Sequence, residues 1–98
     1  MYLKHLLLAE EVGSEYEMFF AINNIGNLYL QQEDWNNALT YLMRNLPYAE
    51  SKGTLDQKAY AYTNLGRCYS GLQQYDKAMP YFEKALPIQM QRTDTARI

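Results

Sequence analysis

The side chains best suited to chemistry in this sequence are two asparagines, Asn24 and Asn64, which lie 40 residues apart. Each comes directly before an aliphatic residue and a glycine, so the two occupy equivalent local contexts. A primary amide carries two donors and an acceptor, and can hydrogen-bond both the N–H and the C=O of an extended peptide backbone. The same amide can instead bond across to a neighbouring helix, which would be a purely structural role.

Residue types that support catalysis or metal binding are scarce. The chain has one cysteine, Cys68, and one histidine, His5, which excludes an internal disulfide and any multi-cysteine or multi-histidine metal site. No nucleophile is placed beside a base, and no glycine-rich phosphate loop occurs. We therefore expect no enzyme, no metal and no cofactor. Cys68 shares the helical register of Leu28, and we expect it to be a small buried apolar residue.

Charge and composition exclude further classes of function. The 98 residues carry 9 Lys and Arg against 11 Asp and Glu, a balance that is unsuited to binding phosphates. Uncharged apolar runs such as Leu6 to Ala9 are too short for a membrane span or a signal-peptide core. We expect a cytoplasmic chain with no direct nucleic-acid partner and no membrane partner. The 13 Leu and 9 Ala, against five Val and Ile, favour helix over sheet.

The chain repeats itself with an offset of 40 residues, which is the signature of a repeat architecture. Residues 21–29 align with residues 61–69, and the match continues in register. Further pairs at this offset are Gly13 and Gly53, Trp35 and Tyr75, Tyr41 and Tyr81, and Leu46-Pro47 and Leu86-Pro87. Residues 1–12 are interpreted as the second-helix tail of a preceding repeat, followed by repeat one over 15–53, repeat two over 55–92 and a frayed tail over 93–98.

Apolar residues within each copy recur at helical spacing. This predicts helices near 15–31, 35–51, 55–71 and 75–91, and a partial helix over 2–12. Pro47 and Pro87 should kink their helices, or else the helices stop at Leu46 and Leu86. The expected core stripes are Ile22, Ile25, Leu28 and Tyr29; Tyr62, Leu65, Cys68 and Tyr69; Ala38, Leu39, Leu42, Met43 and Leu46; and Ala78, Met79, Phe82, Ala85 and Leu86.

Gly26 and Gly66 fall in the middle of the first helix of each copy, where glycine costs about 1 kcal/mol relative to alanine. We expect close helix crossings at these glycines, with Ala38 and Ala78 of the second helices as their partners. Tyr29 and Tyr69 would fill the space one turn along, and Trp35 and Tyr75 would plug the gaps at the turns.

These residues resemble the tetratricopeptide repeat. The resemblance implies an all-α fold of antiparallel helix pairs stacked in a right-handed superhelix, an α-solenoid. The long period and the Asn-Leu-Gly element are similar to those of the subclass with repeats of about 40 residues. The residues that match are Ile22, Ile25-Gly26, Tyr29, Ala38 and Leu42 in the first copy, where Asn45 replaces an alanine, and Tyr62, Leu65-Gly66, Tyr69, Ala78, Phe82 and Ala85 in the second.

In such arrays the first helix of each pair lines a concave groove, and the resemblance implies that Asn24 and Asn64 bind a partner's backbone there. Arg67 can pair with an acidic side chain or a carboxylate, or remain a solvated charge. Phe20 and Tyr60 can contact a ligand or pack between repeats. The remaining groove candidates are Asn23, Asn27, Leu30, Thr63 and Ser70.

The leading hypothesis is a protein–protein interaction module that binds a partner segment in the groove, as part of a larger scaffold or signalling protein. The alternative is self-association into a homo-oligomer through uncapped ends, as the assembly or regulatory region of a bacterial-type signalling regulator. The surfaces available for this are the apolar residues of segment 1–12 and of the last helix, including Ile88 and Met90.

Overall fold

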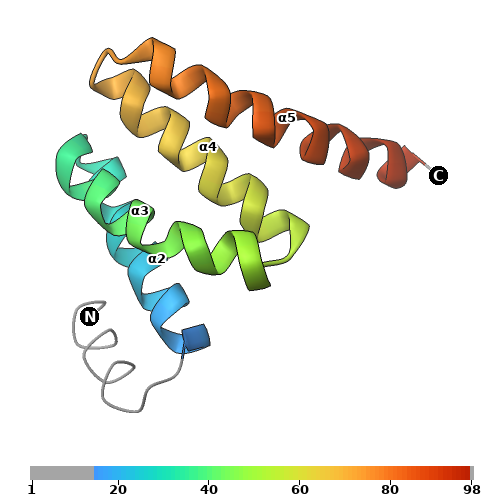
Figure 1. The fold of residues 1–98 in the computed structure, drawn as a ribbon, viewed down its shortest axis with the longest axis horizontal. Helices are drawn as coiled ribbons and strands as arrows, with labels where there is room; N and C mark the ends of the chain where they lie inside the picture. The colour runs from blue at the N-terminus through green and yellow to red at the C-terminus, as the bar shows by residue number, and fades with distance from the viewer. Residues whose placement is uncertain (1–14, 98) are drawn as a thin grey trace.

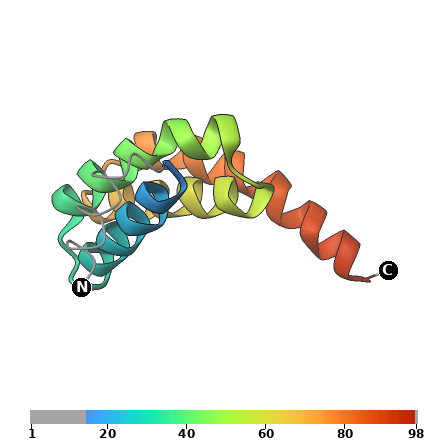
Figure 2. The ribbon, with the colours of Figure 1, turned by 90° about the horizontal axis from the view of Figure 1, so that it is seen from below.

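Four helices make up the part of the chain that the structure, a computed structural model, describes: residues 15–97, with side chains over 15–91. They are α2 (Glu15–Gln31), α3 (Trp35–Lys52), α4 (Leu55–Gly71) and α5 (Tyr75–Arg97). Each helix packs against the next in antiparallel pairs (Figure 1). In the perpendicular view, α2 and α4 lie on one side of the molecule and α3 on the other (Figure 2). The predicted all-α fold of helix pairs is confirmed, and the predicted helix over 2–12 lies outside the described residues.

Local hydrogen bonds set where the helices begin. Asp34 caps α3, because its carboxylate accepts from the backbone N–H of Asn37 at 3.5 Å and from the Asn37 amide at 2.7 Å. Thr54 and Gln57 form a capping box at the start of α4, in which each side chain accepts from the other residue's backbone N–H. The turn residues therefore place α3 and α4 as the sequence predicts.

Three prolines lie inside helices, Pro47 in α3 and Pro80 and Pro87 in α5. Both helices continue past them, so the alternative in which they stop before Pro47 and Pro87 is wrong. The helix predicted near 75–91 is longer in the structure, because α5 runs to Arg97. Gly53 ends α3, whereas its counterpart in α5 is a threonine, which does not terminate a helix.

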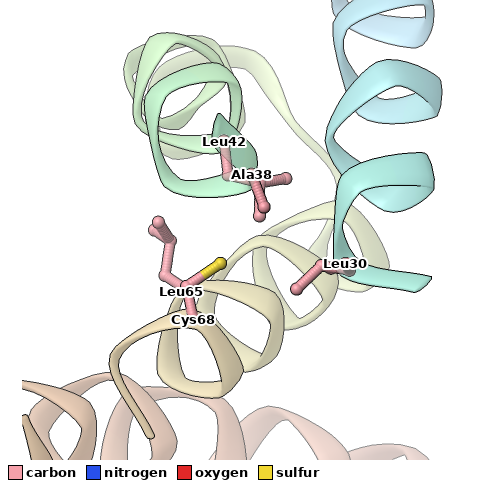
Figure 3. Packing of buried hydrophobic residues seen from close by; sticks show 5 residues of the cluster. All are labelled: Leu30, Ala38, Leu42, Leu65 and Cys68. Atoms are coloured by element: carbon pink, nitrogen blue, oxygen red, sulfur yellow. The ribbon is translucent and has the colours of Figure 1, made fainter. Parts of the chain in front are cut away.

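The main core cluster joins the two copies of the repeat. Leu30, Ala38 and Leu42 of the first copy pack with Leu65 and Cys68 of the second (Figure 3). The cluster therefore spans α2, α3 and α4, and its apolar burial stabilises the two copies against each other.

Two α2 residues exchange the roles that the sequence predicts for them. Leu28, expected in the core, is 41% exposed, and Leu30, expected in the groove, is 2% exposed. The residue of α4 that is equivalent to Leu28 is Cys68, and it is buried. The two positions differ because α4 packs against both α3 and α5, whereas α2 packs mainly against α3. In the second-helix stripes, three further expected core residues are exposed: Met43, Met79 and Leu86.

Gly26 and Gly66 mark a close approach of the two helices in each copy. A Cβ on Gly26 would lie 2.8 Å from Cδ2 of Leu42, and a Cβ on Gly66 would lie 2.6 Å from Cε1 of Phe82. Each glycine therefore leaves room for a large side chain of the following helix.

The alanines expected to face these glycines, Ala38 and Ala78, are not the nearest partners. Both alanines are buried, and Ala38 belongs to the cluster with Leu30 and Leu65. The predicted Gly–Ala crossing is therefore wrong, because the contact falls one helical turn further along the second helix.

A further close contact crosses from one copy to the other. Trp35 begins α3 and Gly71 ends α4, and a Cβ on Gly71 would lie 2.2 Å from Cε2 of the indole. Trp35 thus packs against the end of the following copy's first helix as well as against the core cluster. Its counterpart Tyr75 does not plug a gap among the described residues, since its side chain is 60% exposed.

Equivalent tyrosines stack within each copy at nearly the same geometry. The ring centroids of Tyr29 and Tyr41 are 5.8 Å apart with an interplanar angle of 16°, and those of Tyr69 and Tyr81 are 5.9 Å apart at 7°. These stacked pairs join the first helix of each copy to the second.

Candidate functional site

Two open hollows adjoin each other across α4. The α2–α4 hollow has a volume of about 330 Å³ and is lined by Phe19, Phe20, Asn23, Asn24, Asp56, Gln57 and Tyr60. The α4–α5 hollow has a volume of about 420 Å³ and is lined by Asp56, Ala59, Tyr60, Thr63, Asn64, Arg67 and Gln89. Asp56 and Tyr60 line both hollows. The predicted groove residues that line neither are Asn27, Leu30 and Ser70.

Helical periodicity brings these side chains to one face of each first helix. Asn23 and Asn24 lie three and four positions after Phe20, as Thr63 and Asn64 do after Tyr60, so each set forms a single patch. Since α2 and α4 lie on the same side of the molecule (Figure 2), the two patches contribute to one continuous surface.

Asn64 is the most unusual polar residue of this surface. Its side chain is 3% exposed, and its Nδ2 has no hydrogen-bond partner among the described residues. A buried donor left without a partner costs about 1–3 kcal/mol, and native structures contain few of them. An acceptor supplied from the α4–α5 hollow would satisfy this group.

Asn24 occupies the equivalent position on α2 in a more open setting. It is partly buried, lines the α2–α4 hollow, and makes no side-chain hydrogen bond to another described residue. The two amides differ in burial because α4 is flanked by α3 and α5, whereas α2 packs mainly against α3.

The neighbouring residues Asn23 and Thr63 are held by the second helices. Asn45, which replaces the expected alanine, donates from Nδ2 to the backbone oxygen of Phe19 at 2.8 Å and to Oδ1 of Asn23 at 3.0 Å. In the second copy, Gln89 donates from Nε2 to Oγ1 of Thr63 at 3.3 Å. Both groove residues thus take part in packing within their own copy as well as lining a hollow.

The charges and rings of the surface are distributed unevenly. Asp56 lines both hollows, whereas the exposed Arg67 lines the α4–α5 hollow alone. Phe20 and Tyr60 are 39% and 44% exposed, so neither ring is sequestered in packing between the copies. The surface therefore combines exposed aromatic area, amide groups and both signs of charge.

Sequence reasoning missed five residues of these hollows: Phe19, Asp56, Gln57, Ala59 and Gln89. Asp56 and Gln57 lie four and three positions before Tyr60, so the same helical periodicity could have placed them on its face. Gln89 carried no comparable signal, because it reaches the site from α5, and Ala59 carried none either.

Neither a metal-ligand cluster nor a thiol with a lowered pKa is found among the residues that the structure describes. No group of three or more His, Cys, Asp or Glu that could hold a metal occurs over the described ranges. Burial raises the pKa of the Cys68 thiol to about 11, which disfavours the nucleophilic thiolate. None of the helices over 15–97 is long and apolar enough to cross a membrane.

Comparison with known proteins identifies a repeat family. The family model described as tetratricopeptide repeat matches residues 17–91, which include both hollows and the core cluster. A search of curated proteins gives no match.

Proposed function

Because this chain belongs to the tetratricopeptide repeat family, a non-catalytic module whose repeats generally mediate protein–protein interactions, we propose that it binds an extended partner segment across α2 and α4. The segment would occupy the α2–α4 hollow and the α4–α5 hollow in succession. The amides of Asn24 and Asn64 would then bond its backbone.

The buried, unpartnered Nδ2 of Asn64 carries this proposal. If this asparagine served only to set the spacing between helices, we would expect its amide to bond across to a neighbouring helix. A carbonyl oxygen of a bound segment offers the missing acceptor, and it would remove a free-energy cost of about 1–3 kcal/mol that the free protein bears. Arg67, at the same hollow, can pair with an acidic side chain or a carboxylate of that segment.

The experiment compares the parent chain with the Asn24→Ala/Asn64→Ala double variant on an array of random 12-residue peptides. We expect binding of every parent-bound peptide to fall at least tenfold, with the free energy of unfolding changed by less than about 1 kcal/mol. Asn36→Ala, which removes an exposed amide from α3, is the matched control and should bind as the parent does. Unchanged binding by the double variant, or a loss fully explained by unfolding, would refute the proposal.

Self-association is a second candidate, and exposed apolar side chains on α5 favour it. Tyr75, Met79, Leu86 and Met90 are each more than half exposed. On α3 the equivalent face, which includes Trp35, packs against the core cluster to which α4 contributes.

This candidate is most consistent with a dimer in which α5 of one molecule pairs with α5 of a second molecule. A head-to-tail arrangement would place α2 of the second molecule on α5 of the first, in the way that α4 covers α3 within one chain. However, α2 carries Gln31 where α4 carries Gly71. The Cβ of Gln31 would meet the ring of Tyr75 on α5, just as a Cβ on Gly71 would meet the ring of Trp35. Closed twofold pairing is also the commonest symmetry of soluble oligomers.

Light scattering tests the second candidate directly. The parent should form a dimer in a concentration-dependent manner, and Met79→Glu/Leu86→Glu should be monomeric, because carboxylates would be buried in the pair. A parent chain that stays monomeric at millimolar concentration would exclude this function.

We further propose a cytoplasmic scaffold or signalling role for this interaction. The free, buried thiol of Cys68 supports a reducing compartment, and a groove that reads mainly backbone groups suits an adaptor. Co-localisation of the tagged chain with a cytoplasmic marker is the corresponding measurement, and its recovery from an oxidising compartment would contradict this location.

A further inference from the structure

The α2–α4 hollow pairs two aromatic rings at repeat-equivalent positions. Phe20 on α2 and Tyr60 on α4 both line it, and both are substantially exposed. The ring of Phe20 is held by two neighbours: Tyr16 contacts it edge-on with centroids 4.7 Å apart, and Phe19 does so at 5.9 Å. Phe19 is itself buried, so the aromatic side of the hollow is supported by the core.

One formal charge accompanies these rings. Asp56 is the single charged residue among the described residues that line the α2–α4 hollow. It occupies the repeat position of Tyr16 and precedes Tyr60 by one helical turn, so its carboxylate shares the face of that ring. At this position the second copy therefore has a negative charge where the first copy has a third ring.

The side chain that these features fit is cationic. An ammonium or guanidinium group is attracted to the face of an aromatic ring and forms charge-assisted hydrogen bonds with a carboxylate. An acidic occupant would be repelled by the carboxylate, because like charges repel each other.

The same chemistry already occurs elsewhere in the molecule. Nζ of Lys84 lies 5.5 Å from the ring centroid of Tyr62 and 5.6 Å from that of Tyr81, and Nζ of Lys77 lies 5.9 Å from that of Tyr69. Ammonium groups thus settle over tyrosine rings in this fold at ordinary cation–π distances.

We propose that the α2–α4 hollow binds a lysine or arginine side chain of the partner segment, between Phe20 and Tyr60 and beside Asp56. This inference rests on the proposed function, because it assigns a side-chain preference to a segment bound through its backbone. The basic side chain would fix the register of a segment that the amides alone would hold in any register.

The test uses the 12-residue peptides that the parent chain binds on the random array, resynthesised with each lysine or arginine replaced in turn by norleucine. One such replacement should weaken binding to the parent about three- to tenfold. The same replacement should have less than a twofold effect on Asp56→Asn. Asp56→Lys should reverse the preference, so that a peptide with glutamate at that position binds better than one with lysine.

Asp76→Asn is the matched control. Asp76 lies in the first turn of α5 as Asp56 lies in the first turn of α4, but it lines neither hollow. It should therefore retain the parent's preference for the basic peptide. If Asp56→Asn unfolds the chain, Tyr60→Leu provides the second reading, because removing the exposed ring should also abolish the preference.

The outcomes separate this inference from the proposed function. Binding of peptides by the parent with no loss on any norleucine replacement, or an unaltered preference in Asp56→Lys, overturns the basic-residue assignment and leaves backbone binding intact. A parent chain that binds no peptide of the array overturns both.

Discussion

Replacing Gly71 by alanine tests the joint between the two copies of the repeat. The new Cβ would lie 2.2 Å and 2.3 Å from two ring carbons of Trp35, whereas carbon atoms pack at about 3.5–4.0 Å. The ring or the end of α4 must therefore move by more than about 1 Å, and overpacking of this kind costs about 1–3 kcal/mol. The gain in helix propensity is at most about 1 kcal/mol and is smaller at a helix end.

We therefore expect Gly71→Ala to lower the free energy of unfolding by about 1–2 kcal/mol, or roughly 4–16 °C in melting temperature for a chain of this size. Urea unfolding followed by circular dichroism gives the free energy. The emission of Trp35, the single tryptophan of the chain, reports the displacement of the ring. Gln31→Ala, at the equivalent end of α2, is the control and should change stability by less than about 0.5 kcal/mol.

A double-variant cycle with Trp35→Ala isolates the contact. Once the ring is removed, Gly71→Ala should be neutral or slightly stabilising, because the added methyl then enters open space. The same loss in both backgrounds, or no loss in the parent, would refute the reasoning.

Three further predictions concern packing and titration. Gly66→Ala should lower the free energy of unfolding more than Gly26→Ala does, because its Cβ meets an aromatic ring rather than the end of a flexible leucine. Urea unfolding compares both variants with the exposed Gln32→Ala, and equal values for all three would contradict this packing. Burial raises the pKa of the Cys68 thiol from 9.0 to about 11, so its contribution to stability is complete below pH 9 and lost as the pH rises towards 11. Cys68→Ala should accordingly lose less stability than the parent between pH 8.5 and 10.5, and parallel curves in urea titrations would argue against it. Asn45→Ala should destabilise the chain by about 1–3 kcal/mol through the loss of one buried and one partly buried hydrogen bond. A thermal melt equal to the parent's would show that those bonds contribute nothing.

The fold was predictable because its determinants are local. The 40-residue offset, the helical spacing and turn residues such as Asp34 and Gly53 together specify four helices and their order. The greater length of α5 also has a local origin, since a threonine stands where Gly53 ends α3. The candidate site was largely predictable for the same reason, because equivalent positions on α2 and α4 fall on the same face.

The features that sequence reasoning missed depend on contacts between helices. Leu28 and Leu30 are both apolar and two residues apart, so only the placement of α3 and α4 around α2 decides which of them is buried. Likewise, nothing within α4 explains why residue 71 is a glycine. The reason is the ring of Trp35, which packs against it and leaves no room for a Cβ. Gln89 joins the site from α5, a second helix, whereas the groove was expected to be lined by first helices.

The hydrogen bonds of Asn45 also affect how the surface can respond to a ligand. Its amide fastens α3 to the backbone of Phe19 and to the side chain of Asn23, both of which line the α2–α4 hollow. Force applied to Asn23 by a bound segment therefore reaches the opposite side of the molecule through two short bonds. In the second copy Ala85 stands at this position, and an exposed 3.3 Å bond from Gln89 to Thr63 makes the corresponding link. The second helix is thus tied to the first by one buried and one partly buried hydrogen bond in the first copy, and by one exposed hydrogen bond in the second.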